Sequence, residues 1–178
     1  MNLLNQLGPL LQQYAGGNAS EPPPDVDQHF DQVANAAPKE EVAQGLAGAF
    51  RSSQTPPFGN MMGQLFQHSD PNQRAGILNT LLGSAASGGA MQAMGGAAGG
   101  LGNILGMFGV TGGQVTPQQA QNVPPEAVEK LAHEAEKNDP SIIDRASQFY
   151  AEHPTAVKAL GGLALATILS HMANNQRG

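Results

Sequence analysis

The residues of this sequence that could perform acid–base or metal chemistry are its five histidines and fourteen acidic residues. His133 and Glu134 resemble the start of a zinc-protease helix, but Lys137 stands where that helix needs its second histidine. Zinc on a helix requires two ligands one turn apart, so this segment predicts no metal site. The other histidines fall on different expected helices, at positions 29, 68, 153 and 171.

Nucleophile and nucleotide motifs are also missing. The chain contains no cysteine, which excludes disulfides, thiol catalysis and thiolate metal ligands. Ser84 and Ser87 lie in Gly/Ala-rich sequence and not in a nucleophile elbow. The glycines around Gly100 follow no strand pattern and precede no suitably placed acidic residue, so they form no dinucleotide-binding fingerprint. We therefore expect no catalytic residue, no cofactor and no metal; the chain is predicted not to be an enzyme.

The charge and composition of the chain limit the kinds of partner that it can bind. The net charge is −6, and only eight Lys and Arg residues are spread over 178 residues, so no nucleic acid is expected as a partner. The first six residues lack the basic region of a secretory signal, and no apolar run is long enough to span a bilayer. A cytoplasmic location is the expectation.

Apolar residues recur at helical spacing along most of the chain, which predicts an all-α fold. The densest cluster is Phe58, Met61, Met62, Leu65 and Phe66, at positions i, i+3, i+4, i+7 and i+8. We expect an N-terminal helical unit over residues 25–82.

Three segments have the form of a helix N-cap with a glutamine three residues later. They begin at Asp25, Asp70 and Thr116, and proline is the first helical residue after the last two. The third of these opens a C-terminal helical unit expected over residues 114–178. Its last element is predicted to be one uninterrupted helix from Pro154 through Gly161 and Gly162, either buried in this unit or lying on a membrane surface.

Residues 1–14 are predicted to form an amphipathic helix that Gly8 and Pro9 kink or divide. Residues 15–24 form a linker rich in Pro and Gly, so the helix is expected to be tethered to the rest of the chain. It either packs on its own domain or acts as a detachable docking or self-association helix.

The chain is organised around Ala75–Pro125, a stretch of fifty-one residues without Asp, Glu, Lys or Arg. We expect its central part, residues 83–113, to be a Gly/Ala-rich linker that contains a short apolar helix at 101–108. Its double glycines favour a flexible linker, because each glycine costs a helix about 1 kcal/mol relative to alanine. The small-xxx-small pairs that they form leave close self-packing or membrane contact as alternatives.

The segment Val115–Gln121, preceded by Leu/Gly-rich sequence such as Leu101–Gly106, resembles the bacterial YidB-like family of unknown function. The resemblance covers residues 77–150; the proline-rich linker and the last helix depart from it. It implies a small, soluble, helical bacterial protein, and the family has no assigned catalytic residues to carry over.

These observations predict two small helical units joined by a charge-free segment, and a non-enzymatic interaction or self-assembly protein. Its partner would be another copy of itself or another protein. The alternatives are a peripheral membrane protein that uses the Gly/Ala stretch and the C-terminal helix, and an enzyme with a dispersed His/acid site. The candidate interaction residues are Leu4, Leu7, Leu11, Tyr14, Gly95, Gly96, Gly99, Gly100, Leu101, Ile104, Leu105 and Phe108.

Overall fold

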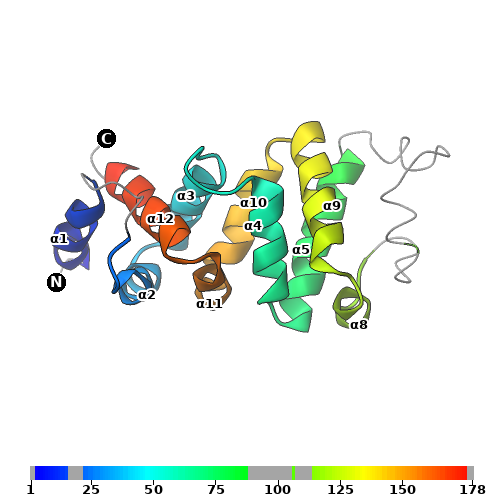
Figure 1. The fold of residues 1–178 in the computed structure, drawn as a ribbon, viewed down its shortest axis with the longest axis horizontal. Helices are drawn as coiled ribbons and strands as arrows, with labels where there is room; N and C mark the ends of the chain where they lie inside the picture. Colours follow the sequence, from blue (N-terminus) through cyan, green and yellow to red (C-terminus); the bar gives the residue numbers. More distant parts are fainter. Residues whose placement is uncertain (1–2, 16–21, 88–105, 107–113, 176–178) are drawn as a thin grey trace. The chain divides into compact units, whose positions relative to one another are not determined.

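The computed structural model describes residues 3–15, 22–87, 106 and 114–175, and within these ranges the regular structure is entirely helical (Figure 1). The all-α prediction is therefore confirmed. The helices are α1 (Leu3–Ala15), α2 (Val26–Ala36), α3 (Lys39–Phe50), α4 (Phe58–Gln67), α5 (Pro71–Ser87), α8 (Pro117–Gln121), α9 (Pro125–Asn138), α10 (Ile142–Ala151), α11 (Pro154–Val157), the 3-10 helix η1 (Lys158–Leu160) and α12 (Gly162–Asn175).

The contacts divide the chain into two compact units, and these units do not follow the order of the sequence. Unit 1 comprises Met1–Pro57 and Ser147–Gly178, and unit 2 comprises Phe58–Ala146. The expected division into residues 25–82 and 114–178 is therefore corrected. The physical reason is that α12, at the end of the chain, packs against α3 and α1, while α4 packs against α9.

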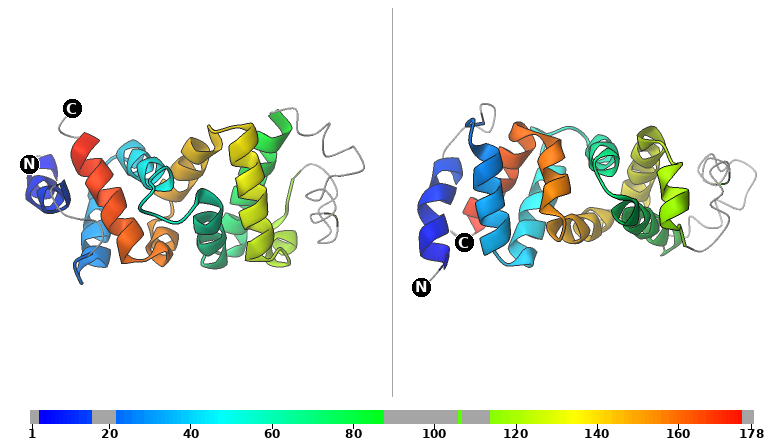
Figure 2. Two further views of the ribbon diagram at one scale, coloured as in Figure 1. Left: turned by 45° about the horizontal axis from the view of Figure 1, so that its top comes forward. Right: turned by 90° about the horizontal axis from the view of Figure 1, so that it is seen from below.

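In unit 1, α12 contacts α1, α2 and α3, as Figure 2 shows for α1 and α12. The helix is apolar on nearly all sides, and its residues from Ala164 to Leu169 are buried. Gly45 on α3 lies so close to α12 that an added Cβ would stand 2.5 Å from Cγ of Met172 and 3.1 Å from the carbonyl oxygen of Ile168. The missing side chain is thus what allows α3 and α12 to approach each other.

Unit 2 is built on α4, which packs along α9, and on α5, which contacts α8 and α9. All five large apolar residues of the α4 cluster are buried, as their spacing predicted. Glycine again allows a close approach: a Cβ on Gly59 would lie 2.7 Å from the carbonyl oxygen of Glu129, and one on Gly63 would lie 2.6 Å from the Glu129 side chain.

The structure bears on two predictions for the N-terminal helix. It runs without interruption through Pro9, whose side chain is exposed, so the proline does not divide the helix. Of the two alternatives for its packing, the structure shows the helix packed on its own unit. Leu7, Leu11 and Tyr14 are buried, and α1 packs against α12 of its own chain.

The predicted long final helix is wrong, because the chain breaks at Gly161. This glycine has a φ of +82°, a left-handed conformation that side-chain-bearing residues adopt only at a cost. The helical segments before and after it, Pro154–Leu160 and Gly162–Asn175, make an angle of 118°. Within the described residues no single helix meets the length and hydropathy expected of a membrane span; this bent pair meets them only when its two halves are taken together.

Two of the three predicted caps form. The Asp70 carboxylate accepts hydrogen bonds from the backbone N–H groups of Asn72 (2.8 Å) and Gln73 (2.9 Å), and the Gln73 side chain accepts one from the Asp70 N–H. Thr116 and Gln119 make the equivalent reciprocal pair at α8. Asp25 makes no such bond at α2.

Candidate functional site

The candidate interaction residues fall into two groups in the structure. Leu7, Leu11 and Tyr14 are buried in unit 1, where they belong to the core rather than to an exposed docking face. Leu4 lies in α1, but its side chain is outside the described part of the structure. The remaining eight candidates, from Gly95 to Phe108, lie outside the described residues.

A polar contact inside unit 1 joins α1 to α2. The Tyr14 hydroxyl lies 2.7 Å from Nδ1 of His29, and the two rings meet edge to face with centroids 5.9 Å apart. Burial, and then the negative charge of Asp25, raises the pKa of the Tyr14 hydroxyl, so this group stays protonated near neutral pH. The pair ties α1 to α2 and presents no activated nucleophile.

A second polar contact in unit 1, an ion pair, joins α2 to η1. Nζ of Lys158 lies 2.7 Å from a carboxylate oxygen of Asp31. The hydrogen bond to Asp31, and then the charges of Asp31 and Asp27, raise the pKa of Lys158 despite a smaller opposing effect of desolvation. A lysine with a raised pKa remains a cation at neutral pH, so it serves as a link and not as a base.

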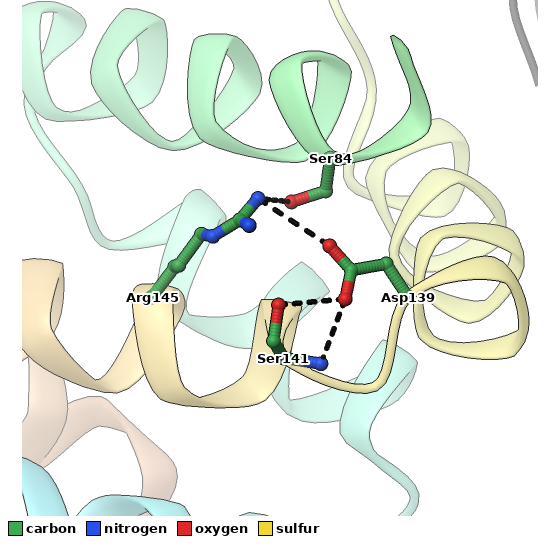
Figure 3. Close-up of polar contacts among 4 residues, drawn as sticks. All are labelled: Ser84, Asp139, Ser141 and Arg145. Atoms are coloured by element: carbon green, nitrogen blue, oxygen red, sulfur yellow. Dashed lines mark hydrogen bonds and ion pairs between the residues drawn. The ribbon is translucent and has the colours of Figure 1, made fainter. Parts of the chain in front are cut away.

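The polar cluster of unit 2 links the end of α5 to the turn between α9 and α10 (Figure 3). Nη1 of Arg145 donates to the hydroxyl of the fully buried Ser84 at 2.7 Å and lies 3.4 Å from Oδ2 of Asp139. The other oxygen of Asp139 accepts from the hydroxyl and the backbone N–H of Ser141. The Ser141 hydroxyl bond, with further help from its backbone N–H and from Arg145, lowers the pKa of Asp139. These bonds join the end of α5 to the turn between α9 and α10, so the cluster holds helices together.

A surface hollow of about 440 Å³ lies in unit 2 at the place where α4 ends and where α5 and α9 begin. Arg74 is its charged residue. Nε of Arg74 donates to the carbonyl oxygens of Phe66 and Ser69, Nη2 donates to that of Gln67, and the guanidinium carbon lies 5.2 Å from the centre of the Phe66 ring. The residues that line the hollow are Phe66, Gln67, Arg74, Gln121, Asn122, Val123, Pro124 and Pro125.

The five histidines do not converge within the described residues, where no group of three His, Cys, Asp or Glu side chains could hold a metal ion. His29 pairs with Tyr14, and His153 packs against the Phe149 ring. His171 faces Gly48, and His68 lies 3.0 Å from the carbonyl oxygen of Gln64.

The sequence patterns did not point to Arg74 or Arg145. Arg145 meets its two partners only because the chain turns back after a helix ends. The same is true of Arg74 and the α4 carbonyls that it reaches. The only signal in the sequence was the predicted cap at Asp70, which fixes where α5 begins and thereby places Arg74 in its first turn.

Neither family models, nor curated proteins, nor solved structures provide a match to this chain. The likeness to the YidB-like family therefore stays a prediction.

Proposed function

We propose that this chain is a non-enzymatic helical protein of the cytoplasm that associates with further copies of itself through the segment at residues 101–108. The observation that carries the proposal is where the large apolar side chains lie. Among the described residues, Leu163 is the one large apolar residue that is exposed, with 37 % of its surface accessible to water. The other large apolar residues are buried or half-buried in the two units. Folded units that bury their own apolar residues offer little apolar surface of their own for a partner.

The segment at 101–108 has the opposite composition. It places Leu101, Ile104, Leu105 and Phe108 at helical spacing with no charged residue near them in the sequence. Burying such apolar residues against another surface removes them from water and lowers the free energy of the system. The burial of Leu7, Leu11 and Tyr14 removes the first helix from the proposed interface and leaves this segment as its centre.

The polar clusters favour binding over catalysis. Each one described above joins two helices or fixes a helix end, and the pKa shifts keep Tyr14 neutral and Lys158 and Asp139 charged near neutral pH. We also propose membership of the YidB-like family, which agrees with a non-enzymatic role because that family has no assigned catalytic residues.

Light scattering across a concentration series tests the proposal. We expect the mass of the unaltered chain to rise with concentration, and the double variant Ile104→Asp, Leu105→Asp to remain monomeric, because two buried carboxylates would each lose hydration. The matched control is Asn103→Asp with Gln114→Asp, which adds the same charge to the same stretch at polar positions. This control should associate like the unaltered chain. A chain that is monomeric at every concentration, or a control that dissociates equally, would contradict the proposal.

A further inference from the structure

The hollow beside Arg74 has the size of a small-ligand site. Its volume of about 440 Å³ falls within the roughly 300–1,000 Å³ of typical ligand pockets. One cation, three amide side chains and two prolines are among its lining residues. It belongs entirely to unit 2, and so its shape depends on that unit alone.

The Arg74 guanidinium retains unused hydrogen-bonding capacity. Its bonds to the carbonyl oxygens of Phe66, Gln67 and Ser69 use Nε and Nη2, and Nη1 has no hydrogen-bond partner in the described part of the chain. No carboxylate of the described residues forms an ion pair with it either. Asp70, the acid nearest in sequence, accepts from the backbone N–H groups at the start of α5. The three carbonyls therefore fix the guanidinium in place and leave its charge for a ligand.

The rest of the lining indicates the class of anion. Phosphate sites at helix starts use several backbone N–H groups, but α9 begins at Pro125 after Pro124, and neither residue has an N–H. With one cation and no backbone cradle, the hollow suits a group of single negative charge. The proline rings beside it offer apolar contact to whatever carries that group.

We infer that this hollow binds a small organic carboxylate, with Arg74 as the partner of the carboxylate and Pro124 and Pro125 as the contact for an apolar body. The net charge of −6 does not prevent this, because charges more than about 8 Å away are largely screened at physiological salt. Glu126 is exposed to solvent at the start of α9, where screening is strongest.

Titration of the full chain with benzoate, followed by NMR, tests the inference. We expect saturable shifts of the Arg74 Nε–H signal and of the backbone amides of Asn122 and Val123. Benzamide has nearly the same shape without the charge, and it should leave these signals almost unchanged. Inorganic phosphate, which lacks the apolar body, should bind more weakly than benzoate.

The informative variant is at the rim, because replacing Arg74 would also remove the bonds that hold the end of α4. Gln121→Glu places a negative charge in the lining of the hollow and should weaken benzoate binding roughly fivefold, as expected for one charge a few ångströms away in water. Gln118→Glu is the matched control: it is exposed on the same short helix but does not line the hollow, and it should bind like the unaltered chain. Absence of saturable shifts with benzoate, equal binding of benzamide or phosphate, or equal effects of the two variants would overturn the inference.

Discussion

Gly45 is the residue at which the packing of unit 1 has the least room. An alanine there would bring its Cβ within 2.5 Å of Met172 and 3.1 Å of the Ile168 carbonyl oxygen. The methionine can move, but the backbone carbonyl of a buried helix cannot move without shifting α12. We expect Gly45→Ala to lower the free energy of unfolding by about 1 kcal/mol, since overpacking costs about 1–3 kcal/mol and the gain in helix propensity returns about 1 kcal/mol.

The control for this variant is Gly8→Ala in α1 of the same unit, where an added Cβ meets nothing within 4 Å. It should raise the free energy of unfolding by up to about 1 kcal/mol through helix propensity alone. Urea unfolding followed by far-UV circular dichroism measures both. If the two variants had the same stability, glycine would not be what permits the contact between α3 and α12.

At the scale of single elements, the two predicted aspartate caps offer a direct comparison. Asp70 bonds two backbone N–H groups at the start of α5, whereas Asp25 bonds none at α2. We expect Asp70→Ala to destabilise the start of α5 by about 1 kcal/mol, the usual value for a lost N-cap, and Asp25→Ala to leave α2 unchanged. Amide hydrogen exchange in the first turns of the two helices measures each effect separately. Equal loss of protection at both helices would contradict the assignment.

Why Asp25 fails as a cap follows from its backbone. A capping residue needs extended dihedral angles, as Thr116 has with φ −82° and ψ 158°. Asp25 instead has φ −93° and ψ 11°, because the chain already turns at Pro23, whose carbonyl oxygen accepts from the N–H of Val26. The pattern of residue types was correct in both places, and the preceding turn decided which cap formed.

The break at Gly161 shows the same limit of the sequence. Hydrophobic spacing continues from Val157 to Met172, so it predicts one helix, and two adjacent glycines are compatible with either a straight or a broken one. In the structure the helix is broken, and Gly162 packs close to Pro22 and Val26. A Cβ added to Gly162 would lie 3.1 Å from the ring of Pro22. A helix continuing straight from η1 would not bring Gly162 to this place, because the reversal depends on the positive φ of Gly161.

Over the whole molecule, local patterns predicted the helices well but not their partners. The buried face of α4 was predicted correctly from spacing, since periodicity reports which side of a helix is apolar. Periodicity does not report which distant face covers it, so the pairing of α3 with α12 escaped prediction. The hollow escaped for the same reason: its lining comes from residues 66–74 and 121–125, which no local pattern brings together.

This pairing makes a prediction for truncation after Ala151. The shortened chain lacks α11, η1 and α12, so the faces of α1, α2 and α3 that α12 covers become exposed. We expect α2 and α3 to lose protection from amide exchange, while α4 and α9 keep theirs because their contacts lie within Phe58–Ala146. Loss of protection in both units would show that they depend on each other for stability. Retained protection of α3 would contradict its reliance on α12.

The separation of α3 and α12 in the sequence also sets the order in which the two helices appear during synthesis. A ribosome adds about 5–20 residues per second, so roughly ten seconds separate the emergence of α3 from that of the helix that covers it. Unit 2 is translated completely within that interval and can fold while the first three helices still lack their core. An apolar face of the first three helices therefore stays uncovered during that interval, and it is a surface that a chaperone can shield until α12 emerges.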